Sequence, residues 1–298
     1  MVFNSEVLLS RLEELAEDID KPRRFLVAMS GGIDSTVLLH ALTKCVERSQ
    51  TPILAIHINH GLHNDATVWE EHCRTMAANL NVSFVSESVE INLESGLGLE
   101  ATARQVRYDA FHKYVEEGDW LLSAHHENDQ AETLFLNLMR GSGFAGIAGI
   151  GALQNFAYGM LVRPLLDISG SAIEAYAEQN KLRWIDDPFN LDMRFDRNFL
   201  RQEIIPTLAE RWPGVSACLR RSAKLASEAS EMLNDLAELD LSTVSIGRKP
   251  DRLDLQGLKS LSEKRQRNVL RHATRKCGLP LPPATRLYQI THELIPAR

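Results

Sequence analysis

The sequence predicts an α/β protein, with a doubly wound parallel sheet followed by a smaller helical domain. Short apolar segments alternate with amphipathic helical patterns over about two thirds of the chain, which is typical of parallel sheets. A glycine-containing turn follows the first of these segments, as expected where a strand passes into a helix. After Trp212 the pattern becomes helical alone, which indicates a domain boundary there.

The predicted elements follow one another in a regular order. A helical pattern at about 7–16 comes first, and strands are predicted at 24–29, 53–58, 82–85, 120–124 and 161–162. Helices are predicted at about 34–47, 66–80, 100–116, 129–140, 170–180 and 198–211. We therefore expect domains at 1–212 and 213–298, with ligands beyond the carboxyl ends of the strands.

Composition restricts the class of protein. The chain of 298 residues is 44% hydrophobic, has no apolar run long enough for a membrane span, and lacks the pattern of a signal peptide. Its four cysteines show no paired spacing, so we expect neither a zinc site nor disulfides; they are Cys45, Cys73, Cys218 and Cys277. A cytoplasmic protein with no membrane segment is expected.

Charge is distributed unevenly along the chain. The net charge is −7, but residues 247–298 carry 12 Lys and Arg against 4 Asp and Glu, a net of +8. Residues 1–246 therefore hold 21 Lys and Arg against 36 Asp and Glu, a net of −15. A basic segment on an acidic body fits either a polyanion-binding end or a solvated helical surface, and charge alone leaves both open.

The glycine turn is the first candidate site. It consists of Ser30, Gly31, Gly32, Ile33, Asp34 and Ser35. Because it joins a buried strand to a helix, its backbone N–H groups and the helix N-terminus would point towards one anion. It is neither a Walker A loop nor a GxGxxG turn. The alternative is a plain turn capped by Ser30 or Asp34.

A second candidate site follows the strand predicted at 120–124. His125 and His126 come after that strand, and Asp129 and Glu132 project from one side of the next helix, one turn apart. Two carboxylates there would bind Mg²⁺ or the ammonium group of an amino acid. Helix capping is the alternative, and the lack of nearby thiolates argues against zinc.

Three further groups are candidates with strong structural alternatives. Asn59 and His60 end the second strand, where a histidine is more often structural. Arg104 and Arg107 share a helical face and would bind phosphate or carboxylate, or form a surface ion pair. The last group lies beside two phenylalanines and would contact RNA, or belong to a solvated loop: Arg194, Arg197 and Arg201.

A series of motifs, taken in order, resembles one family. The motifs are SGGIDS, HINHGL, EATARQVRY, HHENDQAETLFLNLMRGSG, RPLL and WIDDPFN followed by DRNFLR, and they cover about residues 20–212. The sequence resembles the tRNA(Ile)-lysidine synthases of the N-type ATP pyrophosphatase, or PP-loop, superfamily. The resemblance implies an adenine nucleotide alpha hydrolase-like fold. It also implies a ligase that adenylates the wobble cytidine at the oxygen of carbon 2 and then joins L-lysine to that carbon.

The resemblance implies roles for the candidate residues. The residues implied to bind ATP are 30–35 and Asn59. Those implied to support Mg²⁺ are Asp34 and Asp129. Those implied to hold lysine or phosphate, with the roles open within the group, are Asp129, Glu132, Arg104 and Arg107. The implied proton acceptor is His125 or His126, and the implied tRNA contacts are Arg194, Arg197 and Arg201.

The implied partners are L-lysine and an isoleucine tRNA with a CAU anticodon, with ATP as co-substrate; a homodimer is one candidate assembly.

This chain has Asn128 where many relatives have aspartate, so no metal role is assigned there. Longer relatives continue into a β-rich domain that binds the acceptor stem, and that recognition is expected to be missing here. Two alternatives stay open: a PP-loop tRNA thiolase, which needs cysteines near the cleft, and a nucleotide- or RNA-binding module without turnover.

Overall fold

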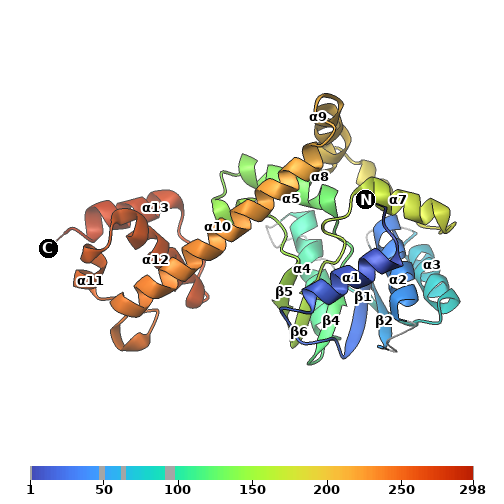
Figure 1. The fold of residues 1–298 in the computed structure, drawn as a ribbon, viewed down its shortest axis with the longest axis horizontal. Coiled ribbons are helices and arrows are strands. Elements are labelled where there is room, and N and C mark those ends of the chain that lie inside the picture. Colours follow the sequence, from blue (N-terminus) through green and yellow to red (C-terminus); the bar gives the residue numbers. More distant parts are fainter. Residues whose placement is uncertain (1, 47–50, 62–64, 91–97, 298) are drawn as a thin grey trace. The chain divides into compact units, whose positions relative to one another are not determined.

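The computed structural model describes residues 2–46, 51–61, 65–90 and 98–297, and Figure 1 shows the elements in chain order. The chain divides into two compact units, each with its own hydrophobic core. The first comprises Met1–Gly141 and Gly149–Arg221, and the second comprises Ser142–Ala148 and Ser222–Arg298. The boundary between residues 212 and 213 stays a prediction.

A six-stranded sheet forms the centre of the first unit, in the order β3-β2-β1-β4-β6-β5. The strands are β1 (Arg24–Met29), β2 (Ile53–Asn59), β3 (Ser83–Ser88), β4 (Asp119–Leu122), β5 (Leu153–Phe156) and β6 (Gly159–Val162). Neighbouring strands pair in parallel except β5, which is antiparallel to β6. The predicted doubly wound sheet is confirmed, and its antiparallel edge strand differs from the wholly parallel sheet expected.

The β5–β6 hairpin lacks the usual sequence signal of a two-residue turn. Its turn contains Ala157 with a φ of 51°, where Asn or Gly would be expected. Gly159 is required at the start of β6, because a Cβ there would lie 2.2 Å from the carbonyl oxygen of Asp119 on β4. Packing against β4, rather than local turn chemistry, therefore accounts for this hairpin.

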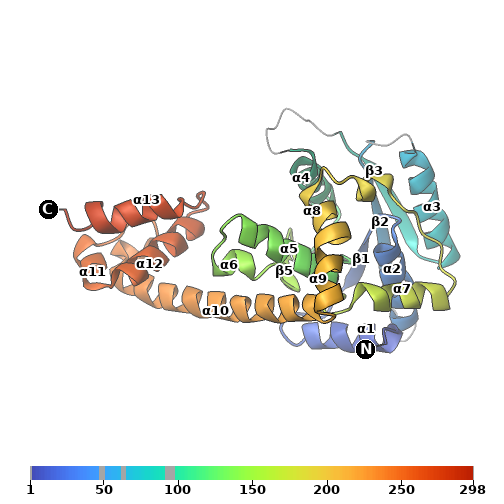
Figure 2. The same cartoon turned by 90° about the horizontal axis from the view of Figure 1, so that it is seen from above.

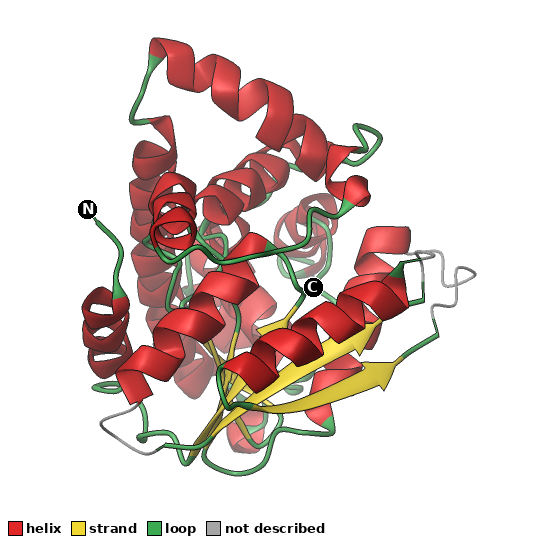
Figure 3. Cartoon of the chain, turned by 90° about the vertical axis from the view of Figure 1, so that its right-hand side faces the viewer, coloured by secondary structure: helices red, strands yellow, loops and turns green. Residues whose placement is uncertain are grey.

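Helices cover both faces of the sheet (Figure 3). One face carries α1 (Ser5–Leu15), α2 (Ile33–Val46), α3 (Ala66–Asn79) and α7 (Gly170–Gln179), and the other carries α4 (Leu99–His112). Helix α2 packs against both α1 and α7 (Figure 2). Along β1, Phe25 and Val27 face the first set of helices and Leu26 faces α4. Burial on both faces explains why the strand is a continuous apolar run.

Three more α-helices lie wholly in the first unit: α5 (Glu127–Met139), which follows β4, and the later helices α8 (Asp196–Phe199) and α9 (Ile205–Arg211). Short 3-10 and π-helical turns flank α8 at Pro188–Leu191 and Leu200–Ile204. Of the arginines predicted to contact RNA, Arg197 lies in α8 and Arg201 in the π-helical turn, whereas Arg194 lies in the loop before α8.

The second unit is largely helical, as predicted. Its α-helices are α6 (Phe144–Ile147), α11 (Leu255–Ser260), α12 (Glu263–Lys276) and α13 (Ala284–Gln289), and α10 (Val215–Val244) begins in the first unit and ends in the second. A 3-10 turn at Ile246–Arg248 and a π-helical turn at Ile290–Leu294 complete the unit. The core residues of this unit are Leu241, Val244, Leu258, Val269, Ala273 and Ile295. Within the described ranges, every helix is too short or too polar to cross a membrane.

Candidate active site

The sheet order places a switch point between β1 and β4. Strand β1 has β2 on one side and β4 on the other, so connections leaving these two strands diverge there. Ligands of doubly wound sheets bind at such a point, beyond the carboxyl ends of the strands. The turn after β1 begins at Ser30, and the turn after β4 contains His125 and His126. The two turns singled out in the sequence therefore flank the switch point.

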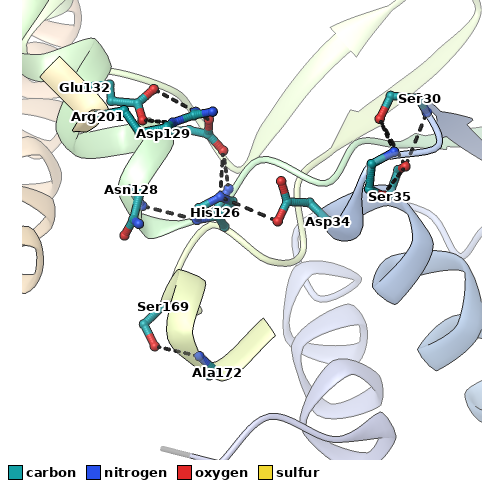
Figure 4. A network of polar contacts seen from close by, with 11 residues as sticks. Ser30, Asp34, Ser35, His126, Asn128, Asp129, Glu132, Ser169, Ala172 and Arg201 are labelled. Carbon is teal, nitrogen blue, oxygen red and sulfur yellow. Dashed lines mark hydrogen bonds and ion pairs between the residues drawn. The ribbon is translucent and has the colours of Figure 1, made fainter. Parts of the chain in front are cut away.

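The turn after β1 is held in shape by its serines and by a glycine. The Ser30 N–H donates to the Ser35 Oγ at 3.2 Å, and the two hydroxyls lie 3.1 Å apart (Figure 4). Gly31 has a φ of 87°, and an added Cβ would lie 3.1 Å from the Cys73 Sγ. The Gly31 carbonyl accepts the backbone N–H of Ile185 at 2.9 Å. This narrow turn leads into the N-terminus of α2, a favourable position for an anion.

His126 lies between two carboxylates (Figure 4). Its Nε2 is 3.6 Å from the Asp34 Oδ1 and 3.6 Å from the Asp129 Oδ2. Its Nδ1 accepts the backbone N–H of Asn128 at 3.3 Å, which assigns the ring proton to Nε2, on the side of the carboxylates. The His126 N–H donates to the Asp129 Oδ2 at 2.9 Å and completes a capping box. Asp129 therefore caps α5 and also faces His126 beside Asp34.

The pKa values of the Asp34 and Asp129 carboxyl groups are shifted in opposite directions. Burial raises the pKa of Asp34, and Asp129 adds to this effect while His126 opposes it. Burial would also raise the pKa of Asp129, but His126, His125 and Arg201 outweigh it, so the pKa lies below its ordinary value. Asp129 is thus the more readily ionised of the two, and a cation beside Asp34 would stabilise the charged form of that residue.

Glu132 is completely buried and is paired with an arginine. Arg201 donates from Nε to the Glu132 Oε1 at 2.6 Å and from Nη2 to Oε2 at 3.0 Å. The same Nη2 lies 3.2 Å from the Asp129 Oδ1. Arg197 approaches from the same segment, with its Nε 3.9 Å from the Glu132 Oε2. Two of the three arginines predicted to contact RNA therefore lie beside the carboxylates of α5.

His125 is a neutral imidazole in a cationic environment. Its Nδ1 is hydrogen-bonded to the Ser123 Oγ. Burial lowers the pKa of His125 to about 4, and although Asp129 opposes this effect, three nearby guanidinium groups add to it. These groups belong to Arg163, Arg104 and Arg197.

Arg163 is a buried cation that lies outside the set of candidate residues. It follows β6 in the RPLL motif and is 3% exposed. Its guanidinium donates to the Gly151 carbonyl at 2.7 Å and to the Gln154 Oε1 at 3.2 Å. The sequence signal that could have pointed to it is a charged residue directly after an apolar strand, which is unusual for a buried position.

Two of the predicted site residues, Arg194 and Asn59, form their ion pair and hydrogen bonds with residues outside the network drawn in Figure 4. Arg194 is 86% exposed and pairs with Asp192 at 2.6 Å. The Asn59 side chain accepts the Gly61 N–H at 2.9 Å and donates to Glu70 at 3.3 Å, so its amide stabilises the end of β2. A contact between Arg194 and tRNA stays a prediction, and so does a contact between Asn59 and ATP.

Helix α4 carries two predicted arginines, one of which contacts His60 at the end of β2. The Arg107 Nε donates to the His60 Nε2 at 3.2 Å, and burial together with that positive charge lowers the pKa of His60 to about 4. Arg104 donates to the Tyr108 hydroxyl at 3.2 Å and lies over the same ring. The charge of Arg104 is also one of the smaller contributions that lower the pKa of His125.

Comparison with known proteins gives matches over both units. Residues 4–208 match a family model described as PP-loop domain, and residues 253–298 match the TilS substrate binding domain. The tRNA(Ile)-lysidine synthase of Coxiella burnetii is 42% identical over 294 residues, which is 99% of this chain and 64% of the relative. That of Proteus mirabilis is 39% identical over 289 residues, or 96% of this chain and 65% of the relative. The chain therefore spans slightly less than two thirds of the length of these relatives.

A solved structure shares the fold. The U34-tRNA thiolase NcsA from Methanococcus maripaludis superposes with a TM-score of 0.60 at 18% sequence identity. The match covers 74% of this chain and 79% of that chain. The likeness supports the predicted fold class and extends no further.

Proposed function

We propose that this chain, which belongs to the PP-loop family, forms lysidine as the tRNA(Ile)-lysidine synthases do. Its proposed substrates are ATP, L-lysine and an isoleucine tRNA with a CAU anticodon. The observation that carries the proposal is the pairing of two turns at the switch point, where His126 lies 3.6 Å from both Asp34 and Asp129. A homodimer stays a prediction.

ATP would place its phosphates at the N-termini of α2 and α5. The contact between His126 and Asp34 brings these two helix starts together, so the positive ends of both helix dipoles lie close to one another. In the first step the cytidine oxygen on carbon 2 attacks the α-phosphorus, and the bond to the leaving pyrophosphate breaks. The positive ends of the helices stabilise the charge on the departing phosphates.

The residues present fit a magnesium ion bound together with ATP. Among the described residues no group of three or more His, Cys, Asp or Glu side chains could hold a metal by itself. Mg²⁺ commonly uses only one or two carboxylates and completes its shell with substrate phosphates and water. Asp34 and Asp129 would supply those carboxylates, and the raised pKa of Asp34 is consistent with a site that favours a cation. When bound, Mg²⁺ would neutralise phosphate charge.

The second step requires lysine with a neutral side-chain amine. The amine nitrogen attacks carbon 2, the bond from carbon 2 to oxygen breaks, AMP leaves, and a proton passes to a base. Ionised Asp129 is one candidate for holding the ammonium group beforehand, and Glu132 is another despite its pair with Arg201. His125, neutral at pH 7, and His126 stay the candidate proton acceptors.

The second unit would contact the tRNA through its basic helix α12. Arg265 pairs with the buried Asp240, so the charge of Arg265 is neutralised within the unit. Lys264 and Arg271 are exposed on the same helix and are candidates to meet phosphates.

The protonation of the two buried thiols, Cys45 and Cys73, favours a ligase over a tRNA thiolase. Cys73 lies beside the phosphate-binding turn, but burial raises its pKa to about 12, and burial raises the pKa of Cys45 to about 11. Both thiols are therefore protonated at neutral pH, whereas sulfur transfer needs a thiolate.

Labelled ATP separates a ligase from a binding module without turnover. With ATP labelled at the γ-phosphate, we expect pyrophosphate release that depends on the CAU isoleucine tRNA and is absent when that tRNA is omitted. With label at the α-phosphate, AMP should appear in amounts equal to the lysine incorporated. Absence of pyrophosphate with every tRNA and amino acid tried would exclude the proposed function.

A further inference from the structure

Ion pairs join helix α10 to the first turn of α5. Arg220, in the second turn of α10, donates from Nε to the Glu127 Oε1 at 3.0 Å and from Nη1 to the Asp167 Oδ1 at 3.1 Å. Glu127 is the first residue of α5, and its side chain is 11% exposed. Arg11 of α1 binds the other oxygen of Asp167, so the acceptor is itself held in place.

The position of Glu127 makes this pair relevant to the site. Glu127 directly follows His126, which caps α5 and faces Asp34 and Asp129. The backbone N–H of Glu127 donates to the Ile168 carbonyl at 2.9 Å, so the turn is fixed through its backbone as well as its side chain. A displacement of this turn would move His126 and Asp129 relative to Asp34.

We propose that Arg220 is a positioning residue for the lysidine-forming reaction, because it holds the first turn of α5 where His126 and Asp129 meet Asp34. The inference rests on the proposed function. Helix α10 continues to Val244 in the second unit, so the residue that positions the catalytic turn belongs to the helix that leads into that unit.

The plain alternative is an ion pair that only stabilises the fold, and a neighbouring arginine provides the control. Arg221 is exposed on the same helix and donates to the Cys218 Sγ at 3.1 Å, within its own helical turn. Arg220→Gln and Arg221→Gln remove the same charge from adjacent positions. Only the first leaves a largely buried carboxylate on α5 without its arginine.

Two measurements on the full chain test the proposal. The first is hydrogen exchange of the amides in the first turn of α5. The second is the single-turnover rate constant for AMP release at saturating ATP, lysine and tRNA, with the tRNA Kd measured separately. For Arg220→Gln we expect faster exchange in that turn and a rate constant lower by about 10- to 100-fold, with the tRNA Kd within about twofold. Arg221→Gln should match the unsubstituted chain in amide exchange, in the rate constant and in the tRNA Kd.

An unchanged rate constant in a less stable Arg220→Gln protein would overturn the proposal, and so would a loss explained by weaker tRNA binding. If Arg220→Gln does not fold, Glu127→Gln removes the same pair from the other side and must reduce the rate constant by a similar factor. Where both fold, their effects must be less than additive. Absence of AMP release from the unsubstituted chain refutes the proposed function, whereas unchanged exchange in Arg220→Gln refutes the positioning role whether or not lysidine forms.

Discussion

Removal of Arg201 tests whether Glu132 is kept ionised in the interior by its arginine partner. Glu132 is completely buried, and its two oxygens accept from Arg201 at 2.6 and 3.0 Å. Arg201→Ala leaves this carboxylate without its bidentate partner. Taking one member from a buried pair costs about 3–5 kcal/mol, and the 40% exposure of the Arg201 side chain lowers our expectation to about 2–3 kcal/mol.

The sign of the pH dependence follows from the direction of the pKa shift. Burial raises the pKa of Glu132, while Arg201 lowers it. Without Arg201 the folded-state pKa rises further, so the folded variant gains a proton at higher pH than the unfolded chain does. The stability deficit of the variant is therefore full at pH 8 and shrinks as pH falls towards the ordinary value of 4.5.

Thermal and urea unfolding between pH 5 and 8 provide the assay. At pH 8 we expect the Tm of Arg201→Ala to fall by about 4–12 °C for a unit of this size. Arg194→Ala is the control, because Arg194 is 86% exposed, and its effect should stay within about 0.5 kcal/mol. A deficit below about 0.5 kcal/mol for Arg201→Ala, or one that grows as pH falls, would show that Arg201 does not keep Glu132 ionised.

Three other tests, which use four substitutions, separate roles within the site. Asp34→Asn should abolish pyrophosphate release while the far-UV spectrum and cooperative unfolding are retained, and continued release would remove Asp34 from the reaction. Glu132→Gln should raise the KM for lysine more than the KM for ATP; equal increases would argue against an ammonium site. Gly31→Ala and Gly61→Ala both place alanine at positive φ, 87° and 63°, but only the first brings its Cβ to 3.1 Å from Cys73. Gly31→Ala should therefore lower the Tm and the ATP affinity more, and equal effects would attribute the loss to backbone strain alone.

The sequence predicts the placement of the two turns because their position depends on local order. Alternation of strands and helices puts Ser30 and His125 at the carboxyl edge of one sheet, whatever the details of packing. The loop from Ser30 to Ser35 and the carboxylates of α5 could therefore be assigned to one site from the order of the elements alone.

Contacts between residues distant in the sequence could not be predicted in the same way. Glu132 and Arg201 are 69 positions apart, and their pairing depends on how α5 packs against the segment around α8. The β5–β6 hairpin depends on the approach of Gly159 to the backbone of β4, and its turn carries no Asn-Gly signal. Arg220 lies beyond the predicted domain boundary at residue 212, so sequence position alone separates it from α5.

Mass spectrometry of the wobble nucleoside is the decisive test of lysidine formation. The chain is incubated with ATP, L-lysine and the CAU isoleucine tRNA, and the tRNA is then digested to nucleosides. We predict a nucleoside heavier than cytidine by one lysine less one water, formed by the unsubstituted chain and absent with Asp34→Asn. Unmodified cytidine, or a product carrying sulfur at that position, would contradict the proposed function.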